Sequence, residues 1–162
     1  MFLLKPESAR DYGDMILNFN NPPSIVISDI PHMVASHVNK RMQQDFFNPH
    51  CGRVVEPTER NILKAENNDL SVSINWLNKR SEAAIKGLKV DGTSIHPITL
   101  TTQRLSLYDN FHQSNTKQKK EFLRRTGQVK ELAGVNSETA EQTNSFLKNS
   151  ARKILEKYGV FD

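Results

Sequence analysis

The apolar segment 25–27, Ile-Val-Ile, is the feature that most constrains how this chain can fold. All three side chains are β-branched, and residues 20–23, Asn-Asn-Pro-Pro, stop any helix that precedes them. Because no polar residue alternates with the apolar ones, the pattern is typical of a strand covered on both faces. We therefore predict a buried strand over residues 24–28. The acidic Asp29 then lies at the rim of a sheet, where α/β folds commonly bind ligands.

Helical periodicity dominates the rest of the chain. The helices expected from it cover residues 7–19, 31–42, 71–89, 117–125 and 137–158, with a shorter one after Pro57. Pro31 suits a first helical turn, where its missing N–H has no partner to lose, and Asp29 could cap that helix. Residues 95–108 predict one further short strand. A mainly α fold with a small β component follows.

Composition places the chain among soluble globular proteins and excludes several function classes. It has 162 residues, 36% of them hydrophobic and 25% charged, which fits a single domain over residues 1–162 with no membrane-spanning segment. Cys51 is the sole cysteine, so no internal disulfide can form and an intracellular, reducing setting is favoured. The net charge of +4 permits contact with nucleic acid but does not demand it.

Four zinc-type donors lie in one window of the sequence: His32, His37, His50 and Cys51. The two histidines on the predicted helix are five residues apart, roughly 140° around the helix axis, whereas paired ligands on one helix normally lie four apart. Histidines that cap or bridge loops therefore explain the window better than a zinc site does.

Three carboxylates form a second constellation: Asp29, Asp109 and Glu141. Oxygen ligands of this kind suit Mg²⁺ or Mn²⁺, and two such ions can clamp the attacking and leaving oxygens of a phosphoryl displacement. Lys148 and Arg152 share the helix edge of Glu141 and could face a phosphate backbone. A solvated flank of mixed charges is the competing interpretation.

A basic segment adds a candidate DNA-binding surface. Its cations are Lys117, Lys119, Lys120, Arg124 and Arg125, with Glu121 the one acid among them. A non-catalytic module that binds nucleic acid or protein would use this segment together with Lys148 and Arg152. In a helical scaffold without a ligand, the same residues would form a solvated face.

Three motifs in order resemble the Kyakuja-Dileera-Zisupton transposases and related transposase-derived proteins. They are residues 23–30 (PSIVISDI), 108–115 (YDNFHQSN) and 136–146 (NSETAEQTNSF), which together span most of the chain. The resemblance implies a ribonuclease H-like nuclease core that cuts and joins DNA with divalent metal, and a nuclear location. It makes Asp29 and Glu141 metal-binding catalytic residues, and it matches Asp109 and His112 to an aspartate–histidine motif.

The chain also departs from the family pattern. His32 stands where relatives have cysteine, and no histidine and cysteine follow Asn115. Only some twenty residues precede the strand at Ser24, so the first core strands and the first catalytic aspartate are absent.

We therefore expect the later part of an incomplete ribonuclease H-like α/β core, with a helical insertion at about residues 30–95. Such a chain would be a fragment or a domesticated derivative, inactive alone. Its exposed sheet edge would pair with a second copy of the chain or with the missing N-terminal part of the fold.

Overall fold

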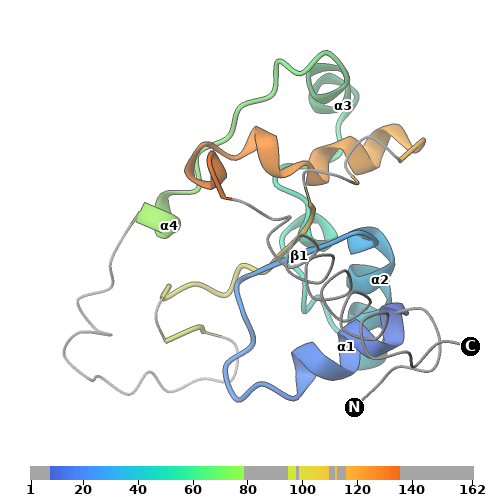
Figure 1. Ribbon diagram of the computed structural model, residues 1–162, viewed down its shortest axis with the longest axis vertical. Coiled ribbons are helices and arrows are strands. Elements are labelled where there is room, and N and C mark those ends of the chain that lie inside the picture. The colour runs from blue at the N-terminus through green and yellow to red at the C-terminus, as the bar shows by residue number, and fades with distance from the viewer. Residues whose placement is uncertain (1–7, 79–94, 98, 110–111, 113–115, 136–162) are drawn as a thin grey trace, which may run out of the picture.

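The computed structural model describes residues 8–78, 95–97, 99–109, 112 and 116–135 (Figure 1). Its α-helices and strands are α1 Ala9–Leu17, β1 Ile25–Ser28, α2 Pro31–Met42, α3 Glu59–Glu66, α4 Asn75–Asn78 and β2 Leu105–Tyr108. Short 3₁₀ helices cover His50–Gly52, Lys119–Arg124, Thr126–Gln128 and Lys130–Leu132. The expectation of a mainly helical chain with a small β component is confirmed.

The two strands form a parallel sheet. Ile25 pairs with Leu105 and Ser28 with Tyr108, so the strands are in register from end to end. The strand predicted over residues 24–28 is confirmed, and the one expected within 95–108 occupies the end of that range. Parallel strands need a long crossover connection, which α2 and the loops after it provide.

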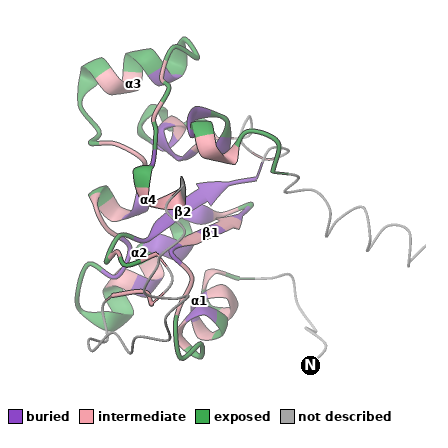
Figure 2. Ribbon diagram, turned by 90° about the vertical axis from the view of Figure 1, so that its left-hand side faces the viewer, coloured by how far each residue is buried: buried purple, intermediate pink, exposed green. Residues whose placement is uncertain are grey.

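Apolar clusters lie on both faces of the sheet, and Figure 2 shows that much of both strands is buried. On one face, Val26 packs in a cluster with Ile16 of α1 and Val34 of α2. On the other, Leu105 and Leu107 of β2 pack with Val129, together with Ile74. This double cover explains why the strands carry apolar runs without polar alternation.

The edges of the two strands differ. At the outer edge of β2, Arg125 forms an isolated parallel bridge with Tyr108, and the loop containing Gly52 packs closely. A Cβ added to Gly52 would lie 3.0 Å from the Ser106 backbone nitrogen, and its φ of +78° also favours glycine. Within the part of the chain described above, β1 pairs with β2 alone.

Capping residues and a proline set the starts of helices α1 and α2. Ser8 and Asp11 form a capping box at the start of α1. Helix α2 begins at Pro31 and ends at Met42, as predicted. The predicted cap at Asp29 is wrong, because Ile30 occupies the N-cap position and makes no side-chain cap bond.

Other helical predictions fail because tertiary contacts override periodicity. The helix expected over 71–89 is replaced at its start by extended chain, where Val72 forms a parallel bridge with Val129, and α4 is one short turn. The basic segment forms a 3₁₀ helix, Lys119–Arg124, instead of an α-helix over 117–125. Residues 79–89 and 137–158 lie outside the described residues.

A buried ion cluster ties the basic segment to the sheet. Glu121 lies between two arginines: its Oε1 is 2.5 Å from Arg53 Nη2 and its Oε2 is 2.5 Å from Arg124 Nε. Arg124 also donates to the carbonyl oxygens of Ser106 at 3.0 Å and Cys51 at 2.8 Å. Burial alone would raise the pKa of Glu121, but Arg124 and Arg53 outweigh it and hold the pKa below its usual 4.5.

We predict that Glu121→Gln lowers the free energy of unfolding by about 3 kcal/mol at pH 7, because the buried Arg124 guanidinium and the partly buried Arg53 lose their counter-charge. A lowered pKa stabilises the fold above the unfolded-state pKa and loses that effect as pH falls through the folded-state value. The difference from wild type should therefore be complete above about pH 4.5 and shrink below it. Urea unfolding at several pH values measures this. The matched control is Glu66→Gln, which breaks an exposed pair with Lys119 and should cost under about 1 kcal/mol. Equal losses for the two variants would contradict the assignment.

Candidate functional site

Asp29 and Asp109 follow the two strands at the same edge of the sheet. Each comes directly after the last residue of its strand, and the Asp109 N–H donates to the Ser28 carbonyl at 3.2 Å. Asp29 is exposed, whereas Asp109 is 9% exposed. Parallel pairing thus brings together two carboxylates that are far apart in the sequence.

Asp109 is held by His112. Its Oδ1 accepts the His112 backbone N–H at 2.6 Å, and its Oδ2 lies 2.8 Å from His112 Nδ1. An ionised carboxylate only accepts, so the imidazole Nδ1–H is the donor in this second bond. The two bonds orient the His112 imidazole against the carboxylate.

The basic segment divides into engaged and accessible cations. Arg124 is 1% exposed and pairs with Glu121 inside the ion cluster, so in this fold its guanidinium is not accessible to DNA. Arg125 lies over the Phe122 ring at 4.1 Å and donates to the Ala65 carbonyl at 3.2 Å, which also argues against a role in binding DNA. Lys119 pairs with Glu66.

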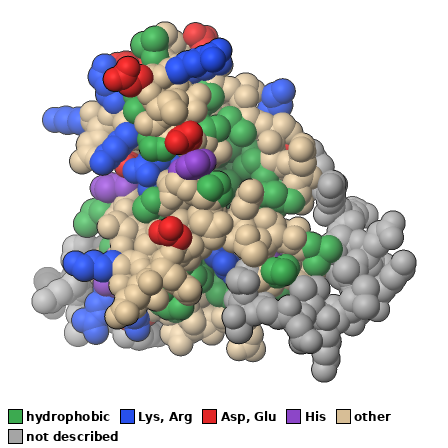
Figure 3. All heavy atoms as spheres, turned by 180° about the vertical axis from the view of Figure 1, so that it is seen from behind, with side chains coloured by type: hydrophobic (Ala, Val, Ile, Leu, Met, Phe, Trp, Pro, Cys, Tyr) green, Lys and Arg blue, Asp and Glu red, His purple; other side chains and the backbone are tan. Residues whose placement is uncertain are grey.

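Lys117 and Lys120 are exposed and remain the candidates for contact with an external phosphate. The predicted partners Glu141, Lys148 and Arg152 lie outside the described residues. On the face shown in Figure 3, basic and acidic side chains are interspersed in the upper part, over the region of α3.

His32 and Tyr108 connect α2 to the end of β2. His32 Nδ1 and the Tyr108 hydroxyl are 3.0 Å apart. Burial raises the pKa of Tyr108, and a hydrogen bond with the Thr116 side chain only partly opposes this. The phenol therefore stays protonated at neutral pH and is available as a hydrogen-bond donor.

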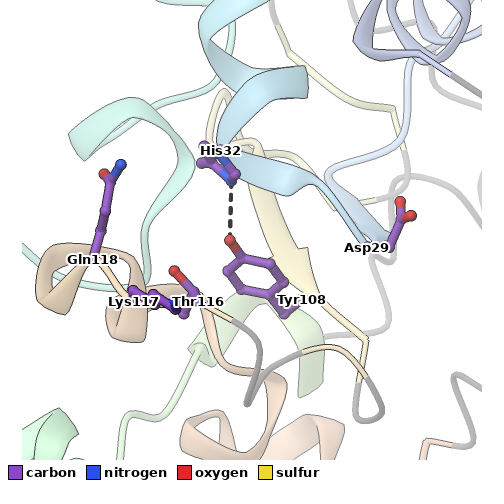
Figure 4. A pocket seen from close by; sticks show the side chains of 6 residues that line it. All are labelled: Asp29, His32, Tyr108, Thr116, Lys117 and Gln118. Carbon is purple, nitrogen blue, oxygen red and sulfur yellow. Dashed lines mark hydrogen bonds between the residues drawn. The ribbon is translucent and has the colours of Figure 1, made fainter.

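A pocket of about 290 Å³ opens beside this pair (Figure 4). Its lining residues are Asp29, His32, Tyr108, Thr116, Lys117 and Gln118. Three of them are consecutive residues of the segment that leads into the 3₁₀ helix Lys119–Arg124, and the others come from the ends of the strands and the start of α2. The pocket thus forms where the sheet edge meets the basic segment.

The described donors fit a divalent cation only in part. Asp29 and Asp109 supply the hard oxygens that Mg²⁺ or Mn²⁺ prefers. Both Asp109 oxygens already accept hydrogen bonds from His112, and the described part of the chain contains no cluster of three or more metal-type side chains. These residues therefore do not form the closed ligand set of a two-metal site.

The zinc-type donors of the sequence do not form a common site in the described structure. His32 is bonded to Tyr108, and the Asn39 amide nitrogen lies 3.7 Å from Cys51 Sγ. The edge of His37 lies near Gly13, at the contact between α1 and α2. These residues bridge and pack elements, as loop-bridging histidines do.

Sequence reasoning missed several residues of the pocket and its support. Tyr108 has a usable signal, because it is the last residue of a predicted strand and directly precedes Asp109. Glu121 also has one, as the single acid within a basic run. Gln118 and Thr116 carry no pattern of their own, and only the folded chain brings them to the pocket.

Comparisons with protein-family models, with curated proteins and with solved structures find no match to this chain. Among the described helices, none combines the length and apolar character that crossing a membrane requires.

We predict that Asp109→Ala lowers the free energy of unfolding by about 1–2 kcal/mol, because the turn after β2 loses two hydrogen bonds. Asp109→Asn keeps the Oδ1 acceptor and should cost clearly less. Urea unfolding compares them, with the exposed Asp45→Ala as the control that should change stability by no more than about 0.5 kcal/mol. Equal losses for the alanine and asparagine variants at position 109 would show that the Oδ1 bond contributes nothing.

Proposed function

We propose that this chain derives from a transposase with a ribonuclease H-like core, and that the full-length form cleaves DNA and transfers its strands with the aid of a divalent metal. The observation that carries the proposal is the placement of Asp29 and Asp109 after adjacent parallel strands, at one edge of a sheet covered on both faces. This is where α/β folds commonly place ligands.

The arrangement of elements supports the proposal in two further respects. Helix α1 precedes β1, in the order that the resemblance implies for a core helix and the strand that carries a metal-binding aspartate. In the described residues β1 has a partner on one edge only, although parallel sheets rarely stop at two strands. That edge is suited to the further strands of a larger sheet.

In the full-length form, Asp29 and Glu141 would hold Mg²⁺ or Mn²⁺, which would activate and orient the phosphodiester for in-line displacement. Asp109 lies beside Asp29 and could add an oxygen ligand. In the resembling family a further aspartate completes the ligand set. We therefore propose that this chain alone does not cut DNA, because a missing carboxylate weakens metal affinity and misplaces the nucleophile.

A second candidate is a non-catalytic module that binds nucleic acid, in the nucleus. It is favoured by Lys117 and Lys120, whose side chains are exposed and, among the described residues, are not engaged as those of Lys119, Arg124 and Arg125 are. Lys117 lines the pocket, and Lys120 lies in the 3₁₀ helix Lys119–Arg124 that follows it. They could therefore contact the phosphate backbone without disturbing the ion cluster.

We predict that Mn²⁺ at millimolar concentration broadens the amide signals of residues 28–30 and 109 selectively, because the two strand-end carboxylates attract it. Asp29→Asn and Asp109→Asn should each weaken the effect several-fold, whereas Asp45→Asn, a change of the same charge at an exposed position, should not. Nuclear magnetic resonance with paramagnetic relaxation measures this. Broadening spread evenly over surface carboxylates would refute a metal-binding edge.

We predict that the chain binds duplex DNA with an affinity that falls as salt rises, since each lysine–phosphate contact releases counterions. Lys117→Gln and Lys120→Gln together should reduce the slope of log affinity against log salt by about 2, at about 0.9 per contact. Fluorescence anisotropy measures it, and the exposed Lys40→Gln on α2 is the control. No binding at low salt would exclude the module, and a slope unchanged by the double variant would place the contacts elsewhere.

A further inference from the structure

We infer that the pocket lined by His32, Lys117 and Gln118 is a phosphate-binding subsite. That the phosphate belongs to a DNA strand rests on the proposed function, whereas the recognition of phosphate itself rests on the pocket alone. The pocket holds about 290 Å³, enough for a phosphate group with part of what it is attached to.

Two hydrogen-bond donors line this pocket from one stretch of backbone. Lys117 and Gln118 are consecutive and supply an ammonium and an amide, while Thr116 before them bonds to Tyr108. Figure 4 shows Gln118 and His32 on either side of the space next to Tyr108, with Lys117 and Thr116 below. Charge-assisted hydrogen bonds to phosphate oxygens are the strongest that such a set can make.

The Lys117 ammonium supplies the charge that such a site needs. Two other cations of the basic segment already form ion pairs: Lys119 with Glu66 and Arg124 with Glu121. Lys117 is exposed and lines the pocket, with no carboxylate within ion-pair distance among the described residues. Its charge is therefore available to an incoming anion.

The Tyr108 hydroxyl sets which imidazole nitrogen of His32 faces a ligand. Tyr108 stays protonated and lies 3.0 Å from His32 Nδ1, and Thr116 bonds to the phenol in turn. When Thr116 donates to Tyr108 and Tyr108 donates to Nδ1, the remaining proton of neutral His32 is on Nε2. The Nε2–H group then serves as a donor to an anion and offers no lone pair to a metal.

Asp29 lies at the other end of the pocket. Figure 4 shows it well apart from Gln118, with its carboxylate directed away from the Tyr108–His32 pair. Its negative charge repels a phosphate that carries no counter-ion but attracts a divalent cation bound to a phosphate. The pocket therefore has a donor end for phosphate and an acidic end for a cation, and substitution of Asp29 should affect the two ligands in opposite directions.

The test is a titration of the whole chain with inorganic phosphate, followed by ¹H–¹⁵N nuclear magnetic resonance. We expect shifts at residues 32 and 116–118. Lys117→Gln should weaken phosphate binding about five- to tenfold, the loss of one partly exposed charge-assisted bond. Lys40→Gln, the same charge change at an exposed position on α2 outside the pocket lining, should change it less than twofold.

Two further variants sharpen the result. Asp29→Asn should tighten phosphate binding about two- to threefold while it weakens Mn²⁺ binding, because it removes one negative charge from the rim. Tyr108→Phe should weaken phosphate binding and change the ¹⁵N shifts of the His32 ring, since Nδ1 loses its donor. Equal effects of Lys117→Gln and Lys40→Gln, or weaker phosphate binding in Asp29→Asn, would overturn the inference.

A second arm distinguishes this inference from the proposed function. It repeats the titration with a 5′-phosphorylated oligonucleotide and with duplex DNA. Phosphate binding that depends on Lys117 without DNA binding would support the subsite and refute the DNA-acting proposal. DNA binding that is insensitive to Lys117→Gln would refute the subsite and leave the proposal standing. Binding of both that depends on Lys117 would support both.

Discussion

The buried guanidinium of Arg124 connects more of this structure than any other single group described. It donates hydrogen bonds to the carbonyl oxygens of Ser106 in β2 and of Cys51 in the 3₁₀ helix His50–Gly52. It also pairs with Glu121, which forms a second ion pair with Arg53. A buried charge is tolerated only when it is paired and its hydrogen bonds are met, so these partners must assemble together. The segment that ends in Arg124 is thereby fixed against the outer edge of β2, and its first residues reach the pocket at the end of that strand.

This fixation explains why the site lies at one edge of the sheet. Parallel pairing places Asp29 and Asp109 at the same strand ends, and apolar packing on both faces leaves the strand ends as an accessible rim. The basic segment then supplies Lys117 to that rim, while its arginines are turned inward. Opposite charges reach the same pocket because Asp29 directly follows β1 and Lys117 lies just before the 3₁₀ helix Lys119–Arg124.

The parts of the fold that could be predicted are those set by local chemistry. The β-branched run gave β1, and Pro31 fixed the first residue of α2, because both preferences act within a few residues. The parallel bridge of Val72 with Val129 joins residues more than fifty positions apart. The burial of Arg124 depends on its counter-charge Glu121 and on the distant Cys51 carbonyl oxygen. Asp29 was placed correctly at the rim, but no pattern foretold that Thr116 and Gln118 would line the pocket with it.

The separation of charge within the pocket bears on what the site can bind. A pocket with only carboxylates would favour a bare cation, and one with only donors would favour a bare anion. Here a single exposed carboxylate and a single ammonium line the same space, while Tyr108 and His32 are hydrogen-bonded to each other between them. A bare phosphate meets the ammonium and a bare cation meets the carboxylate, so each simple ion finds one charge of the opposite sign. A ligand that carries both signs, such as a phosphate with its divalent counter-ion, meets both charges within the same pocket.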